Sequence, residues 1–195
     1  PPHMVQAIIA GGDVALRQSV EGAEDSMEEG AAAMTRSSVS DKDTVVGICA
    51  SGRTPFVIGA LMRAAELGAR TVAVTTNPGS RITESAMVSI APDVGPEVIA
   101  GSTRMKSGTA QKLVLNMLST ASMVLIGKVY GNLMIDLRPL SEKLIERAKG
   151  ILMILTGASY DQASSVYERS GRDVKVSILM LKGGVDPLRA RQLLE

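Results

Sequence analysis

Short β-branched segments alternate with longer helical patterns along residues 4–140, and this alternation constrains the possible folds more than any other feature. Four segments are mostly apolar without strict alternation, as in a parallel sheet that helices cover on both faces: residues 4–10, 44–50, 70–76 and 87–92. Helical patterns follow them at residues 13–34, 55–67, 80–86 and 102–127. This order predicts an α/β fold with a three-layer parallel sheet.

The long helical pattern at residues 102–127 has many apolar positions in its middle: Leu113, Leu115, Met117, Leu118 and Met123. A helix that is apolar on several sides is typical of a protein interior. We therefore expect most of the middle of this helix to be buried.

The chain changes character near Pro139. Beyond it, short helical patterns are separated by Gly or Asp, at residues 141–156, 160–170, 173–182 and 186–194. The pattern predicts two domains, a main domain over residues 1–138 and a small C-terminal helical domain over residues 139–195.

Composition excludes several classes of function. The 21 Lys and Arg residues nearly balance 20 Asp and Glu, and aromatic residues make up 2% of the chain, so neither a basic field nor stacking platforms favour a nucleic-acid partner. One Cys, Cys49, cannot form an intrachain disulfide or a Cys-rich zinc site, and the one His, His3, lies in the N-terminal tail. We expect no metal site and no Ser-His-Asp triad, which leaves acid–base chemistry to carboxylates, Lys or Tyr.

No segment resembles a secretory signal or a membrane span. The start of the chain lacks a basic region followed by an apolar core. The longest apolar stretch, residues 113–127, is interrupted by polar residues and is shorter than the ~18 residues that a spanning helix needs. We expect a cytoplasmic protein with no membrane partner.

The turn that follows the segment 44–50 is a candidate anion site. It reads Ser51-Gly52-Arg53-Thr54-Pro55 and leads into a helix whose free N–H groups and dipole attract an anion. Gly52 lets the backbone approach the ligand, and Ser51 and Thr54 add hydroxyl donors, as in a site for a phosphate monoester. The alternative is an ordinary strand–helix turn that Ser and Thr cap.

A cluster of carboxylates lies in the second helical pattern. Glu21, Glu24 and Glu28 would share one face of a continuous helix. Such a face is usually solvated, but Gly22 and Ala23 in its middle indicate close approach by another group. This stretch is therefore a candidate source of a catalytic carboxylate.

The segment 95–109 is a second candidate anion site. Arg104 and Lys106 stand at the start of a helix, where cations oppose the dipole, and an anionic ligand would offset that cost. Alternatively, both side chains point to solvent or pair with acids. Asn77, in the turn 77–80, would face the same crevice at the carboxyl ends of the strands.

These motifs resemble a known family. Residues 50–55, 77–80 and 95–112 are similar to the sugar isomerase (SIS) domain of the N-acetylmuramic acid 6-phosphate etherases and of glucokinase regulatory protein. The motif Glu-Gly-Ala-Glu-Asp at residues 21–25, with residues 127–128 and 131–134, points to the etherases. The resemblance covers almost the whole chain.

The resemblance implies an activity and a set of site residues. Etherases of this family cleave the lactyl ether of N-acetylmuramic acid 6-phosphate to N-acetylglucosamine 6-phosphate and D-lactate in cell-wall recycling, without a metal or other cofactor. Glu24 matches one of the family's two catalytic glutamates, and we assign it the removal of a proton. The residues expected to bind the sugar phosphate are Ser51, Gly52, Arg53, Thr54, Asn77, Glu97, Ser102, Thr103 and Lys106.

The chain also departs from the family pattern. In the family, a first strand, a further phosphate loop and the other catalytic Glu precede the segment that matches residues 1–4. The chain therefore resembles an etherase with an incomplete SIS domain, and we expect it to be inactive or poorly folded alone. SIS domains generally pair, which predicts a homodimer. The rival functions are a non-catalytic sugar-phosphate-binding regulatory module and an aldose–ketose phosphosugar isomerase.

Overall fold

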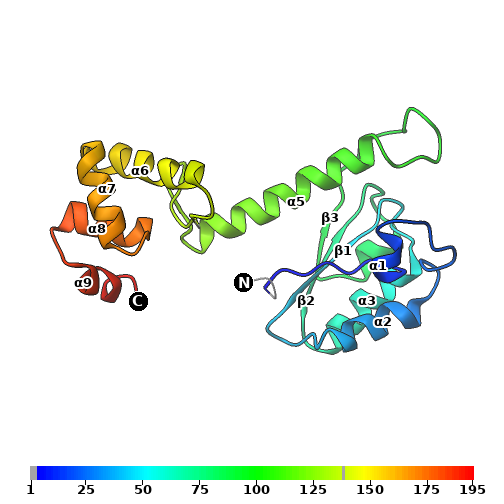
Figure 1. The fold of residues 1–195 in the computed structure, drawn as a ribbon. Helices are drawn as coiled ribbons and strands as arrows, with labels where there is room; N and C mark the ends of the chain where they lie inside the picture. The colour runs from blue at the N-terminus through cyan, green and yellow to red at the C-terminus, as the bar shows by residue number, and fades with distance from the viewer. Residues whose placement is uncertain (1–3, 138) are drawn as a thin grey trace. The chain divides into compact units, whose positions relative to one another are not determined.

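A computed structural model describes residues 4–137 and 139–195. The chain divides into two compact units, Pro1–Met117 and Leu118–Glu195, and the helix α5 (Lys106–Leu125) crosses this division (Figure 1). His3 lies outside the described residues. Arg138 also lies outside the described residues. The predicted domain boundary, between residues 138 and 139, falls there and stays a prediction.

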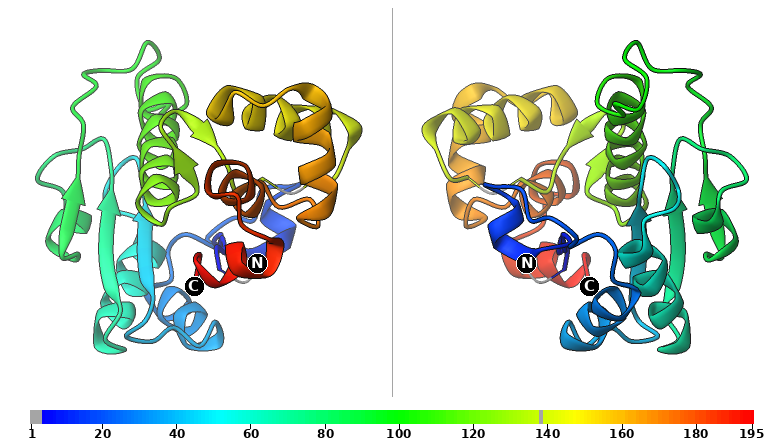
Figure 2. Two further views of the ribbon diagram at one scale, coloured as in Figure 1. Left: turned by 90° about the vertical axis from the view of Figure 1, so that its left-hand side faces the viewer. Right: turned by 90° about the vertical axis from the view of Figure 1, so that its right-hand side faces the viewer.

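A three-stranded parallel sheet forms the centre of the first unit. The strands β1 (Thr44–Ile48), β2 (Arg70–Val74) and β3 (Val88–Ile90) pair in that order, and their arrows lie side by side in Figure 2. Thr44 aligns with Arg70, and Val72 aligns with Val88. β-branched residues dominate each strand, as pleated and largely covered strands prefer. The predicted α/β class with a parallel sheet is confirmed.

Two helices pack closely in the first unit. The helix α3 (Pro55–Glu66) packs on β1 and β2, and α2 (Met27–Arg36) packs on α3. A Cβ added at Gly30 would lie 2.0 Å from the Phe56 carbonyl oxygen, and one at Gly59 would lie 2.1 Å from the Met27 carbonyl oxygen. The two backbones therefore touch at two reciprocal glycines, beside a core that includes Ala33, Met34, Phe56 and Ala60.

The N-terminal part of the chain differs from the prediction. Residues 4–10 are not a strand, and the predicted helix 13–34 is two helices, α1 (Gly12–Ala15) and α2. Gly22 has φ 71°, which interrupts a helix, and Ser26 begins α2 by accepting a hydrogen bond from the Glu29 N–H. Only Glu28 of the three predicted carboxylates lies in a helix, so the shared helical face is wrong.

The short helix α4 (Arg81–Glu84) follows β2, and α5 follows β3. In α5 the buried residues are Ser107 and Val114, seven positions apart on one side of the helix. Leu113, Leu115 and Met117 are exposed, with Met117 at 62%. The expectation of a buried middle is wrong at these three positions, because the apolar residues of α5 lie on several sides whereas its buried residues, Ser107 and Val114, lie on one.

After the end of α5, the described residues of the second unit form a hairpin and four helices. The strands β4 (Val129–Tyr130) and β5 (Leu133–Met134) pair across a turn in which Gly131 has the positive φ that such hairpins need. The helices are α6 (Glu142–Thr156), α7 (Tyr160–Arg169), α8 (Val174–Gly183) and α9 (Pro187–Gln192). Their core includes Leu152 and Tyr167, both fully buried. The helices match the predicted ranges closely, whereas the hairpin was not predicted.

Candidate functional site

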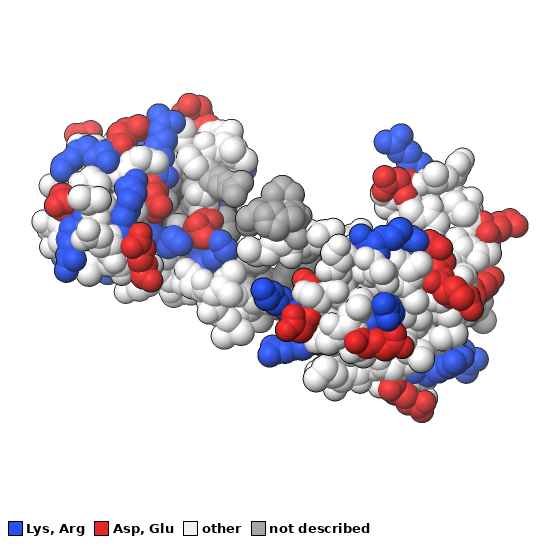
Figure 3. Space-filling view, turned by 90° about the horizontal axis from the view of Figure 1, so that it is seen from below, with Lys and Arg blue, Asp and Glu red and all other residues white. Residues whose placement is uncertain are grey.

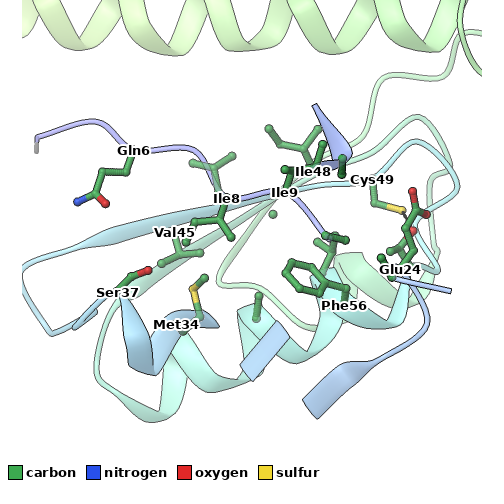
Figure 4. Close-up of a pocket in the computed structure, with 18 of the residues that line it drawn as sticks. Gln6, Ile8, Ile9, Glu24, Met34, Ser37, Val45, Ile48, Cys49 and Phe56 are labelled. Atoms are coloured by element: carbon green, nitrogen blue, oxygen red, sulfur yellow. Dashed lines mark hydrogen bonds between the residues drawn. The ribbon is translucent and has the colours of Figure 1, made fainter. Parts of the chain in front are cut away.

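A cavity of about 680 Å³ lies in the first unit, along β1 and the start of α3. Glu24, Cys49, Ser51, Thr54 and Thr103 are among the residues that line it. Figure 4 shows Glu24 and Cys49 at one end of the cavity and Gln6 and Ser37 at the other. The cavity therefore brings four of the predicted site residues, Glu24, Ser51, Thr54 and Thr103, to one space.

The loop between β1 and α3, residues 50–54, is built from the local sequence. Pro55 is the first residue of α3, where its missing N–H costs nothing. Thr54 is the N-cap residue, but its side chain makes no capping hydrogen bond to the helix. Ser51 Oγ accepts a hydrogen bond from the Arg53 N–H at 3.3 Å. The alternative of an ordinary capped turn is thus not realised at Thr54, whose hydroxyl is not used by the helix.

Cys49 lies beneath the hydroxyls of this loop. Its Sγ donates to Thr54 Oγ1 at 3.0 Å and lies 3.3 Å from Ser51 Oγ. Burial pushes the pKa of the Cys49 thiol up, but the hydrogen bonds that the sulfur shares with the Ser51 and Thr54 hydroxyls and with the backbone of Thr54 and Arg53 outweigh that effect, and the pKa lies below its usual value. The thiol therefore holds both hydroxyls in place on the lining of the cavity.

The turn after β2 is hydrogen-bonded to the backbone of the same loop. Asn77 Nδ2 donates to the Ser51 carbonyl oxygen at 2.9 Å, and the Thr75 hydroxyl donates to the Ala50 carbonyl oxygen at 3.1 Å. Ser80 Oγ lies 1.9 Å from the position of a Cβ on Gly52, which has φ 69°. Only glycine fits position 52, because any side chain would collide with Ser80 and the backbone lies in the left-handed region.

Glu24 is attached to the start of α3. Its carbonyl oxygen accepts a hydrogen bond from the Phe56 N–H at 3.0 Å. Its side chain is exposed and lines the cavity together with Ser51. Among the described lining residues, the only other carboxylate is that of Asp43, which precedes β1 and accepts hydrogen bonds from Ser40. Asp43 lies at the opposite end of β1 from Ser51, whereas the Glu24 backbone is bonded to the start of α3, next to the loop.

The start of α5 already has an anion. The Glu97 carboxylate accepts hydrogen bonds from the Lys106 and Ser107 N–H groups, each at 3.0 Å. These backbone hydrogen bonds hold the pKa of Glu97 below its usual value. The predicted need for an anion near Arg104 and Lys106 is therefore met by the chain's own carboxylate.

The predicted site residues divide into two groups. Gly52, Arg53, Asn77, Glu97, Ser102 and Lys106 do not line the described cavity, although Gly52 and Arg53 belong to the loop and Asn77 supports it. The sequence interpretation missed Cys49, Thr75, Thr76, Ser80 and Ser107 as parts of the site. Their signal was position, because the first four lie at or just after the carboxyl ends of two predicted strands.

Surface charge, possible metal ligands and helix lengths are three further features of the described residues. The face shown in Figure 3 carries Lys and Arg interspersed with Asp and Glu. In the described ranges, no three His, Cys, Asp or Glu side chains gather as they would around a metal ion. None of the helices described in the structure is long and apolar enough to cross a membrane.

Comparisons with known proteins identify relatives. Residues 2–65 match the family model of the glucokinase regulatory protein N-terminal SIS domain. The chain is 51% identical over 97% of its length to N-acetylmuramic acid 6-phosphate etherase of Clostridium beijerinckii, covering 62% of that protein. It is 52% identical to the proteins of the same name from Clostridium botulinum (strain Loch Maree) and Clostridioides difficile, over 98% and 99% of its length, and covers 64% of each.

The chain thus spans somewhat less than two thirds of the length of these curated relatives. At about half identity over nearly all of this chain, the similarity extends across the loop 50–54, the segment around Glu24 and the helices of the second unit. The resemblance to the etherases is confirmed: this chain is similar to proteins named N-acetylmuramic acid 6-phosphate etherase over nearly all of its length, and its residues 2–65 match the SIS-domain model.

Proposed function

We propose that this chain provides the sugar-phosphate site and one catalytic carboxylate of an N-acetylmuramic acid 6-phosphate etherase. The observation that carries the proposal is that Glu24 lines the same cavity as the Ser51 and Thr54 hydroxyls. The similarity to proteins of that name supports the choice of substrate.

The phosphate binds at the N-terminus of α3. The helix dipole attracts an anion there, and the Thr54 hydroxyl is not used as a helix cap. Pro55 has no N–H and the Phe56 N–H donates to the Glu24 carbonyl oxygen, so the loop hydroxyls are the main donors. Ser51, Gly52, Arg53 and Thr54 form the loop around the phosphate, and Asn77 holds the loop by its bond to the Ser51 carbonyl. Thr103, on the lining of the cavity, contacts the sugar together with its neighbours Ser102 and Lys106.

Glu24 acts as the base. In the ring-opened sugar the hydrogen on carbon 2 is acidic because it lies next to the aldehyde. Glu24 removes this proton, the electron pair moves toward the aldehyde oxygen, and the bond between carbon 3 and the lactyl oxygen then breaks. Lactate leaves with that oxygen and takes up a proton, and water adds across the new double bond. The chemistry requires correctly placed acid and base groups and no change of oxidation state.

The test follows the carbon 2 hydrogen. The chain is incubated with N-acetylglucosamine 6-phosphate in D2O, and exchange at carbon 2 is followed by NMR. Exchange needs only a bound sugar and a base, and not the second catalytic glutamate of the complete reaction. We therefore expect exchange from the native chain even where lactate release fails, and its loss, by about 100-fold or more, in Glu24→Gln. Glu21→Gln is the matched control, because Glu21 lies in the same segment and outside the cavity lining. Equal exchange in both variants would refute the role of Glu24.

The same assay separates the rival functions. A regulatory module binds the sugar phosphate without exchange at carbon 2. An isomerase exchanges the hydrogen but converts the aldose to a ketose, whereas the proposed reaction releases D-lactate from N-acetylmuramic acid 6-phosphate.

The finer organisation is also a proposal. Residues 1–138 form a three-layer SIS domain, supported by α3 on one side of the sheet and the inward side of α5 at Ser107 and Val114. Residues 139–195 form the small helical domain, supported by the compact core of α6–α8. The similarity to the etherases supports a cytoplasmic homodimer that needs no cofactor.

A further inference from the structure

We propose that Glu97 is a positioning residue for the loop 50–54, acting through the start of α5 and a chain of hydroxyls. This inference rests on the proposed function, because it concerns the same sugar-phosphate site. Glu97 does not line the cavity, and both of its carboxylate oxygens are engaged by backbone N–H groups of α5. Its effect on a ligand is therefore transmitted through other residues.

The first link is the bond between Glu97 and α5. The Lys106 and Ser107 N–H groups are among the N–H groups of a helix start that lack a helical partner. By accepting from both, the carboxylate closes the loop 97–107. Packing does little to hold this loop, since Val98 is 77% exposed and Ile99 is 68% exposed. A segment with so few buried contacts depends on its polar anchor, and here that anchor is Glu97.

The second link runs from α5 to the turn after β2. Ser107 is 3% exposed, and its Oγ accepts a hydrogen bond from the Thr76 hydroxyl at 2.8 Å. The Glu97 carboxylate and this part-buried hydroxyl pair together fix the position of Ser107. If Ser107 is displaced, the Thr76 hydroxyl loses this acceptor and reorients.

The third link reaches the loop 50–54. Thr76 Oγ1 lies 3.2 Å from the Ala50 carbonyl oxygen, and the Thr76 N–H donates to the same oxygen at 3.3 Å. Ala50 immediately precedes Ser51. Thr103, which belongs to the loop that Glu97 closes, lines the same cavity as Ser51. Glu97 thus acts on the cavity from two directions, through Thr76 and through Thr103.

The test uses the full chain with inorganic phosphate and N-acetylglucosamine 6-phosphate as probes. Glu97→Gln removes the charge and replaces one acceptor oxygen with a donor. We expect its affinity for both probes to fall by about 3- to 30-fold, the range for residues that act through others. Asp93→Asn is the matched control, because Asp93 is exposed on the same connection and its carboxylate accepts one backbone bond, from the Gly95 N–H. The control is expected to bind like the native chain.

Amide hydrogen exchange separates positioning from a local effect. In Glu97→Gln we expect faster exchange at Lys106 and Ser107 and also at residues 50–54, while α2 stays protected. Protection that is lost at α5 alone, or affinity equal to that of the native chain, would overturn the inference. Loss of protection throughout the unit would also overturn it, because it would show a general structural role.

A second variant tests the path. Thr76→Val breaks the chain of hydroxyls without touching Glu97. If the path is real, the double variant loses less affinity than the sum of the two single variants, whereas additive losses would overturn it. If the native chain binds neither probe, the proposed function fails. The exchange result at residues 50–54 then decides the Glu97 inference separately, supporting it if protection there is lost and overturning it if protection is kept.

Discussion

The contact between α2 and α3 gives the sharpest prediction about stability. Gly30 and Gly59 each face a backbone carbonyl of the opposite helix, at 2.0 Å and 2.1 Å from the positions of their missing Cβ atoms. Gly30→Ala or Gly59→Ala would force these helices apart, since a carbon–oxygen contact is comfortable only at about 3.4 Å. Each substitution adds one methyl group, but the helices must move to accommodate it, because the clashing atom belongs to the main chain and cannot rotate away.

The magnitude follows from two opposing effects. Overpacking of a rigid contact costs about 1–3 kcal/mol, and an overlap of more than 1 Å against backbone belongs at the upper end. Replacing Gly by Ala inside a helix returns up to about 1 kcal/mol of helix propensity. We therefore expect each variant to lose about 2 kcal/mol of unfolding free energy. One separation of the helices relieves both clashes, so the double variant should lose less than the sum.

Unfolding in urea, monitored by amide hydrogen exchange in α3, measures this loss of unfolding free energy. The control is Gly150→Ala in α6, where no atom of the described residues outside the adjacent helix backbone lies within 4 Å of the added Cβ. That variant is expected to gain about 0.5–1 kcal/mol, read from exchange in α6. If Gly30→Ala and Gly59→Ala stabilise their unit as Gly150→Ala stabilises its own, the close contact between α2 and α3 is refuted.

Two further predictions concern buried and charged groups. Tyr167→Phe should leave the unfolding free energy in urea unchanged or raise it by up to about 1 kcal/mol, because the Tyr167 hydroxyl is buried and has no hydrogen-bond partner among the described residues; a clear loss contradicts this. Backbone N–H groups at the start of α5 lower the pKa of Glu97, Lys128 lowers that of Asp136, and Lys149 lowers that of Glu146. Their stabilisation is therefore complete above their unfolded pKa values and lost as pH falls through the lower folded ones. If the urea concentration at the unfolding midpoint were the same at about pH 6 and about pH 2, this pH dependence would be contradicted.

Local signals predicted the elements that local chemistry determines. β1, β2 and α3 were predicted correctly. A run of β-branched residues favours a strand and Pro55 favours a helix start, and both preferences depend only on residues nearby in the sequence. Residues 4–10 were wrongly predicted as a strand, since a strand also needs a partner for its backbone, and pairing is not a local property. Ser26 with Glu29 was a readable helix start, but the apolar pattern on both sides of it hid the break at Gly22.

The site was predictable where a strand runs into a helix and not where distant groups meet. Ser51 and Thr54 followed from the turn after β1. The cations Arg104 and Lys106 correctly indicated that the start of α5 needs an anion, but Glu97 supplies it from nine residues upstream of Lys106. Nothing in the spacing shows that this loop folds back on itself, because Gly101 and the exposed residues around it allow many conformations.

The position of Cys49 has a practical consequence. It is the single cysteine of the chain, and its sulfur lies within hydrogen-bond reach of the two hydroxyls on which a phosphate would draw. When a ligand takes those hydroxyls, the thiolate loses the donors that stabilise it, and alkylation at a fixed mildly alkaline pH slows. Mass spectrometry of the native chain, without an introduced label, therefore tests occupancy: we expect slower alkylation of Cys49 when ligand is bound.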